Sequence, residues 1–197
     1  YSRYMELTSS PYEYCHVTIT TRNRESILRT NGERAFVISQ LQDLLSPRFI
    51  IGDVPAYRQL ASCIDLLAFS ITHEAIHFVL FTIDETLARD FAHRIAARLT
   101  QYQYEYTRSH PRPPCDASIA IKKLTGPHEA LRHTTEIHLL HQDWENDRYS
   151  SIGFYLHDRR GDWMRIWRLS TLYDNDPLTY RSLLDFSPNQ LLVRPAS

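Results

Sequence analysis

The segment Ser70-Ile-Thr-His-Glu-Ala-Ile-His-Phe-Val-Leu-Phe-Thr-Ile-Asp84 decides the fold, because it fits two structures with two different metal sites. As a helix, it contains H-E-x-x-H over 73–77, the zinc-protease pattern that sets two histidines one turn apart. The β-branched and aromatic run 78–83 instead predicts a buried strand. Residues four apart on a strand lie about 13 Å from each other, too far for one ion. We therefore expect a strand.

A strand allows a different metal site. Side chains at i and i+2 point the same way, so a His-hydrophobe-His sequence on a central strand can share a divalent cation. Ala75-Ile76-His77 has this spacing with alanine in the first position. A rearranged turn that brings His73 near His77 is the alternative route to a metal. Otherwise the metal pair is incomplete, and we expect no cofactor.

Composition indicates a globular chain of 197 residues, with 43% hydrophobic and 12% aromatic residues. Five glycines disfavour a Gly-rich nucleotide-binding loop. No apolar run approaches the length of a membrane span, about 18 residues. The first residues of the sequence lack a signal-peptide pattern. Because the first residue is Tyr1, we expect a chain cut from a longer one. Three widely spaced cysteines without C-x-x-C predict reduced thiols in a cytoplasmic protein: Cys15, Cys63 and Cys115.

The kinds of charged residue in the chain are more informative than its net charge. The net charge is −1, which does not by itself indicate a nucleic-acid binder. All 22 basic residues except Lys122 and Lys123 are arginine, the side chain preferred for bidentate phosphate and base contacts. Genome bias also produces arginine-rich chains, so the composition permits DNA binding without requiring it.

Hydrophobic periodicity predicts strands over 12–21, within 60–71, over 76–83 and over 117–124. Between them it predicts helices over 33–45 and from the cap Asp84 onward. Further helices are expected over 128–141, 149–156, 162–172 and 177–186. This order matches an α+β, ferredoxin-like (split βαβ) antiparallel sheet with helices on one face and appended C-terminal helices. We divide the chain into a core, 1–125, and a helical extension packed on it, 126–197.

Four places in this order resemble one family, the REP-associated tyrosine transposases, relatives of insertion-sequence transposases with the HUH nuclease fold. They are Tyr14-Cys15-His16-Val17-Thr18 with the following Arg22-Asn23-Arg24-Glu25 and Ile27; the strand pair 67–81; the helix 87–110; and the tail from Glu136-Ile137-His138 through Tyr149-Ser150-Ser151 to 162–180. The resemblance spans nearly the whole chain in the right order. It implies a DNA-binding protein of the transposase type.

The chain departs from that family at its chemistry. The resemblance implies a divalent metal held by two histidines and a tyrosine that attacks the scissile phosphate. Ala75 stands where the first ligand belongs, with His77 as the vestigial second. The segment 116–123, where the nucleophile is expected, contains no tyrosine. We therefore expect a relative that binds DNA but no longer cuts it, with no catalytic residues.

Phosphate contacts depend on basic side chains rather than on a metal. The expected DNA-binding residues are Arg22, Asn23, Arg24, Arg94, Arg98, Arg108, Arg112, Lys122, Lys123, Arg159 and Arg160. Each could equally be a solvated surface residue.

Other polar and aromatic residues have structural interpretations first. His16 is expected as a hydrogen-bonded core histidine rather than a ligand. His138 and His141 could pair with Glu136 or Asp143, or simply occupy exposed helical positions. Three tyrosines spread around the long helix are expected to pack or face solvent rather than stack on bases: Tyr102, Tyr104 and Tyr106.

Three functions fit these features. The first is a domesticated, transposase-derived regulator of transcription that binds a DNA hairpin or duplex, is cytoplasmic and nucleoid-associated, and could form a homodimer. The second is an active single-strand nuclease or transposase with a rearranged metal site. The third is a protein–protein interaction module on the transposase scaffold, which the near-neutral charge favours.

Overall fold

The computed structural model describes residues 12–22, 25–46, 58–106, 116–157 and 159–186. In chain order its elements are β1 (Glu13–Thr21), α1 (Asn31–Leu45), α2 (Arg58–Cys63), β2 (Ile64–Ile71), β3 (Ile76–Thr82), α3 (Glu85–Tyr106), β4 (Ala117–Leu124), α4 (Pro127–His138), η1 (Trp144–Asn146), α5 (Ile152–Leu156), α6 (Trp167–Ser170), η2 (Thr171–Tyr173) and α7 (Pro177–Asp185).

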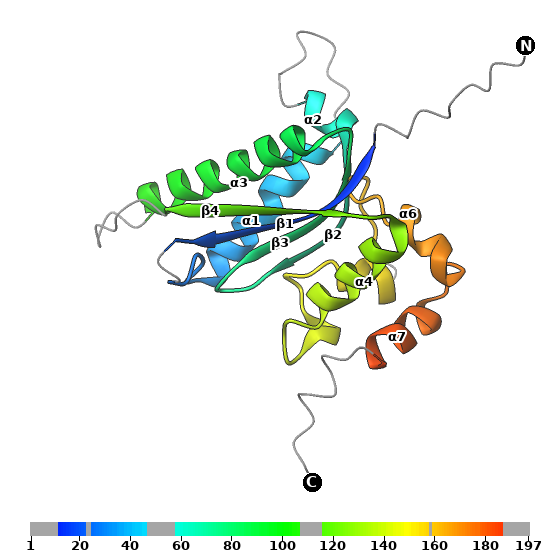
Figure 1. Ribbon diagram of the computed structural model, residues 1–197. Helices are drawn as coiled ribbons and strands as arrows, with labels where there is room; N and C mark the ends of the chain where they lie inside the picture. The colour runs from blue at the N-terminus through cyan, green and yellow to red at the C-terminus, as the bar shows by residue number, and fades with distance from the viewer. Residues whose placement is uncertain (1–11, 23–24, 47–57, 107–115, 158, 187–197) are drawn as a thin grey trace, which may run out of the picture.

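The four strands form one sheet in the order β2-β3-β1-β4, and every neighbouring pair is antiparallel. The first six main elements follow the order strand, helix, strand, strand, helix, strand, apart from the short α2. This is the expected ferredoxin-like topology, and the prediction of an α+β fold is confirmed (Figure 1).

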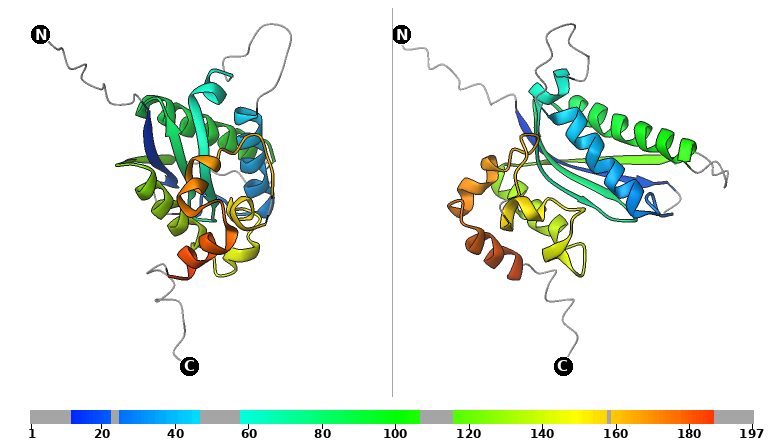
Figure 2. Two further views of the ribbon diagram at one scale, coloured as in Figure 1. Left: turned by 90° about the vertical axis from the view of Figure 1, so that its right-hand side faces the viewer. Right: turned by 180° about the vertical axis from the view of Figure 1, so that it is seen from behind.

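The sheet lies between two helical layers. Helices α1 and α3 cover one face, while α4 lies against the other, with α6 packed on α4 and α7 packed on α5 (Figures 1 and 2). Helix α4 contacts all four strands. Both faces of β2 and β3 are therefore shielded, which explains why these strands are nearly continuous apolar runs with few exposed positions.

Strand β1 alternates between two environments. Cys15, Val17 and Ile19 are buried, whereas the residues between them are only half-buried. In the register, Val17 lies opposite Phe78 of β3 and Ile121 of β4. Phe78 meets Phe91 of α3 edge-on, with ring centroids 5.5 Å apart. The odd-numbered residues of β1 therefore face α3, and the even-numbered residues face α4.

The two long helices begin at side-chain caps. Thr30 and Glu33 form a reciprocal capping box at the start of α1. The Leu87 amide donates to Asp84 Oδ1 at 2.9 Å at the start of α3, so the predicted Asp84 cap is confirmed. Helix α3 then buries a stripe that includes Phe91, Ile95 and Leu99.

The segment 60–71, expected to contain a strand, divides into the end of α2 and the strand β2, which begins at Ile64. Two short C-terminal stretches pair with the free edge of β2, through a bridge between Ser150 and Ser70 and a bridge between Met164 and Leu66. The Ile71 amide donates to the Tyr149 carbonyl, and the Ser151 amide donates to the Phe69 carbonyl, both at 2.9 Å. An edge strand that is paired in this way is protected from pairing with other chains. The predicted division of the chain at 125/126 remains a prediction.

Within the described part of the chain, none of the helices combines the length and apolar composition that a membrane span requires.

Phe78 is the residue whose truncation tests the sheet–α3 core. It is fully buried, so Phe78→Ala should lower the free energy of unfolding by about 3–5 kcal/mol through lost contacts and a cavity. Phe186→Ala, at a side chain 86% exposed, should change it by less than about 0.5 kcal/mol. Urea unfolding followed by circular dichroism measures both, and equal effects would contradict the assigned packing.

Candidate functional site

The polar face of the sheet meets α4 at a set of side chains from three strands. The register places His16 opposite Lys122 of β4 and Thr18 opposite His77 of β3. Because directly opposed residues share a face, all four side chains lie on the side that α4 covers. Thr20 and Ser118, a further opposed pair, extend this polar strip along the two strands. Both are half-buried.

Three histidines on this face form a chain of close ring contacts. His16 Nε2 lies 3.2 Å from His77 Nδ1. His16 Nδ1 lies 3.0 Å from Nδ1 of His133, which α4 contributes. Lys122 Nζ lies 3.0 Å from His133 Nε2, and Thr18 Oγ1 lies 3.3 Å from His77 Nδ1. The chain therefore runs from an ammonium group through three imidazoles to β3.

Donor and acceptor roles along the chain follow from its charged end. The Lys122 ammonium can only donate, so His133 Nε2 accepts and His133 Nδ1 carries the proton. His133 then donates to His16 Nδ1, and His16 donates through Nε2 to His77 Nδ1. These roles use the acceptor nitrogen of every ring and leave the Nε2–H of His77 as a donor.

All three rings are neutral at pH 7. Burial, together with the neighbouring His77, His133 and Lys122, lowers the pKa of His16 to about 3. Burial also lowers the pKa of His77 to about 4. For His133 burial again lowers the pKa, and the Glu136 carboxylate opposes this shift. Neutral rings are consistent with the hydrogen-bond chain, because an imidazolium has no acceptor nitrogen.

Carboxylates of α4 surround the Lys122 end of the chain. Glu129 Oε1 lies 3.4 Å from Lys122 Nζ and 3.3 Å from an Arg132 nitrogen. Glu136 Oε2 lies 3.4 Å from His133 Nδ1. Hydrogen bonds from the Thr125 amide and hydroxyl, helped by Lys122, lower the pKa of Glu129 to about 2. The positive charge of Lys122 is thus paired with the negative charge of the Glu129 carboxylate.

The residues present do not supply the His-hydrophobe-His pair that the resemblance implies. Ala75, only 8% exposed, precedes β3 and offers a methyl group where the resemblance implies the first ligand. His73 Nδ1 lies 2.9 Å from the Leu28 carbonyl oxygen, so it is held in the turn rather than turned toward His77. Among the described residues, no three His, Cys, Asp or Glu side chains are placed to hold one metal ion. The three imidazoles form a chain because His16 directs its two nitrogens to different partners.

Tyr14, Tyr155 and Tyr180 each pack against another aromatic ring. Tyr14 shares the face, two positions before His16, but its ring packs on Phe81 with centroids 4.8 Å apart. Burial raises the pKa of Tyr14. Tyr155 and Tyr180 are buried in the C-terminal layer, where burial raises the pKa of each well above its ordinary value. Sequence reasoning missed Tyr14 as a member of this face; the alternation of β1 was the signal that could have found it.

Both alternatives for His138, a pair with Glu136 or Asp143 and an exposed helical position, are wrong. His138 is fully buried, with Nδ1 2.7 Å from Tyr180 Oη and Nε2 2.7 Å from Ser151 Oγ. Ser151 Oγ also accepts from the Phe69 amide of β2 at 2.9 Å. This network joins α4 and α7 to the sheet edge. His141 pairs with Asp147, 3.3 Å away, rather than with Asp143.

The expected DNA-binding residues do not form a single patch. Lys122 and Lys123 are neighbours whose side chains lie on opposite faces of β4. Arg94 and Arg98 belong to α3, in the other helical layer. Arg22 pairs with Asp116 at 3.3 Å, and the Arg159 guanidinium lies 4.9 Å above the Phe154 ring near α5. Arg160 is exposed nearby, while Asn23, Arg24, Arg108 and Arg112 lie outside the described residues.

Acid should destabilise the fold through the histidine chain. His77 binds no proton in the folded state until the pH falls to about 4, whereas in the unfolded chain it titrates near 6.5. Its stabilising contribution is complete above about pH 6.5 and is lost as the pH falls toward its folded pKa. The His77→Gln variant should therefore lose less stability on acidification, by up to ~1.4 kcal/mol per pH unit.

Urea unfolding at several pH values between about 7 and 5 checks this slope. His93→Gln, at an exposed position of α3, serves as the matched control. A His77→Gln variant whose stability depends on pH as strongly as that of the wild type would contradict the buried neutral ring.

Comparison of the sequence with protein-family models and with curated protein sequences finds no match. Among solved structures, the chain is similar to a REP-associated tyrosine transposase bound to a REP hairpin. The two are 15% identical with a TM-score of 0.43, and the match covers 84% of this chain and 94% of that chain.

Proposed function

We propose that this protein is a transposase-derived DNA-binding regulator that recognises a hairpin or duplex and no longer cleaves DNA. The single observation that carries the proposal is the polar face of the sheet beside α4. This face carries hydrogen-bond donors that suit phosphate oxygens. Beside it, Ala75 occupies the position where the resemblance implies the first metal ligand.

The donors on this face are of the kinds that contact nucleic-acid backbones. Lys122 provides an ammonium group whose side chain is 55% exposed, and Thr18, Thr20 and Ser118 provide hydroxyl groups on the same strands. The hydrogen-bond chain leaves His77 as a donor. Amines, hydroxyls and ring N–H groups all donate to phosphate oxygens.

Loss of cleavage rests on the two departures from the transposase pattern. Ala75 cannot bind a cation, and the acceptor nitrogen of His77 is engaged by His16. The expected nucleophile segment 116–123 contains no tyrosine. Without a Lewis acid and a positioned nucleophile, binding is the activity that remains.

One observation favours a protein–protein interaction module as the second candidate. Three of the proposed DNA-binding cations pair with carboxylates: Arg22 with Asp116, Lys122 with Glu129, and Lys123 with Glu13. Such pairs reduce the local positive potential that attracts DNA. A protein that binds no DNA at low salt would support this second candidate.

DNA binding should depend on Lys122 and not on Lys123. Because Lys122 faces the polar strip, Lys122→Gln should weaken binding of a hairpin and of a duplex alike, and should reduce the slope of log K against log salt by about one. Lys123→Gln, on the opposite face of the same strand, is the matched control. Fluorescence anisotropy over a salt series measures both variants. Equal slopes for Lys122→Gln and the wild type would place the DNA elsewhere.

Cleavage should be absent even when metal is supplied. Incubation with Mg²⁺ or Mn²⁺ and palindromic single-stranded DNA should yield no covalent protein–DNA adduct on a denaturing gel, since the metal pair is incomplete. An adduct that survives denaturation would instead establish the nuclease alternative. Repeating the reaction with Tyr14→Phe would then ask whether the tyrosine on the sheet face is its nucleophile.

A further inference from the structure

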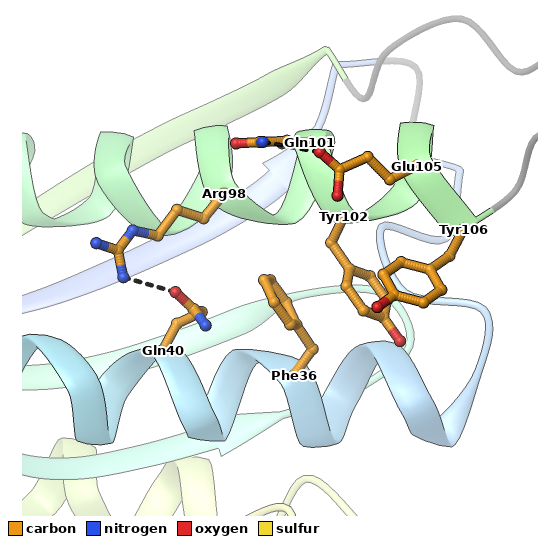
Figure 3. A pocket seen from close by; sticks show the side chains of 7 residues that line it. All are labelled: Phe36, Gln40, Arg98, Gln101, Tyr102, Glu105 and Tyr106. Atoms are coloured by element: carbon orange, nitrogen blue, oxygen red, sulfur yellow. Dashed lines mark hydrogen bonds between the residues drawn. The ribbon is translucent and has the colours of Figure 1, made fainter.

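A groove between α1 and α3 lies in the helical layer on the far side of the sheet from the histidine chain. It has a volume of about 390 Å³, within the roughly 300–1,000 Å³ range of small-ligand sites. Its lining combines three aromatic rings with polar side chains (Figure 3): Phe36, Gln40, Arg98, Gln101, Tyr102, Glu105 and Tyr106.

The aromatic rings form a stack along the groove. Tyr102 stacks on Phe36 of α1, with ring centroids 4.1 Å apart and an interplanar angle of 20°. Tyr106, one turn further along α3, lies on Tyr102 at 4.5 Å and 30°. Among the described residues the series ends at Tyr106, which is 73% exposed. An aromatic ring that is held on one side and open to solvent on the other offers a surface on which a flat group can stack.

A cation lies at the other end of the groove. Arg98 Nη1 donates to Gln40 Oε1 at 2.6 Å, so α1 orients the guanidinium through a neutral amide (Figure 3). A neutral partner leaves the full charge of Arg98 for an anion. The Glu105 carboxylate accepts from Gln101 Nε2 at 2.9 Å. The groove thus joins an oriented positive charge to the aromatic platform Tyr106, which lies about two turns further along the same helix.

We propose that this groove binds single-stranded DNA, with an unpaired base stacked on Tyr106 and a backbone phosphate held by Arg98. The inference rests on the proposed function, because it assumes that the protein meets DNA, and it adds a second contact surface for an unpaired segment. An aromatic platform beside a cation is the arrangement that recognises single strands without reading their sequence. Paired bases inside a duplex present no free ring face, so the groove selects unpaired DNA.

Two tyrosines of equal exposure make a matched test. Tyr104 and Tyr106 are both 73% exposed, but Tyr104 does not line the groove. Tyr106→Ala should weaken binding of a short oligo-dT strand by roughly tenfold, whereas Tyr104→Ala should leave it unchanged. An abasic strand of the same length keeps the phosphates and lacks the rings, so its binding should be insensitive to Tyr106→Ala. Anisotropy of end-labelled strands measures each affinity.

The salt dependence of binding by an Arg98 variant gives a second test. Arg98→Gln should lower the salt slope for oligo-dT by about 0.7, while Arg89→Gln, at an exposed residue paired with Glu85 on the same helix, should not. The far-ultraviolet circular dichroism of every variant should match the wild type.

The outcomes separate this inference from the proposed function. A wild type that binds a hairpin but not oligo-dT, or a Tyr106→Ala variant that binds oligo-dT like Tyr104→Ala, overturns the groove assignment alone. A wild type that binds no DNA of any form at low salt overturns both. Loss of oligo-dT binding by Tyr106→Ala, with hairpin binding through Lys122 retained, supports both surfaces.

Discussion

Strand β1 occupies a central position in the sheet, and its alternation of side chains organises both layers of the molecule. Its odd positions, represented by Val17 and Ile19, enter the core beneath α3, so they are apolar and fully buried. Its even positions, represented by His16 and Thr18, face α4 and reach polar partners from both neighbouring strands. A shift of one residue in the register would exchange these sets and bury the histidines in the apolar core. The candidate site therefore exists because this register is fixed.

Helix α4 and the segment that follows it are joined to the sheet by hydrogen bonds. His133 of α4 extends the histidine chain to Lys122, and His138, five residues further along, joins Tyr180 to Ser151. Ser151 in turn receives hydrogen bonds at the free edge of β2. Helix α4 thus carries two buried imidazoles with different tasks. Burial keeps His138 neutral, lowering its pKa to about 3, so both parts of this interface are stable only while their rings are unprotonated.

The two helical layers offer different chemistry to a nucleic acid. The α4 side provides hydroxyl groups, imidazoles and Lys122, which suit phosphate contacts. The α1–α3 side provides the aromatic series that ends at Tyr106, together with Arg98. A chain with a net charge of −1 cannot attract DNA through overall charge, so recognition would depend on such local groups. On the proposed function, carboxylates such as Glu129 that pair with the cations would limit non-specific DNA binding for the same reason.

Local sequence patterns determined the strands, the long helices and their order. Periodicity and β-propensity depend on neighbours along the chain, so the strand over 76–83 and the Asp84 cap could be predicted directly. The alanine at position 75, in place of the first histidine of a His-hydrophobe-His sequence, could likewise be recognised from the sequence. Tertiary structure alone decided which side chains meet: His16 and His133 are separated by 117 positions in the sequence, and no local pattern encodes such a contact. The burial of His138 was missed for the same reason, because a polar residue on a helix is buried only when distant segments, here those of Ser151 and Tyr180, supply its hydrogen-bond partners.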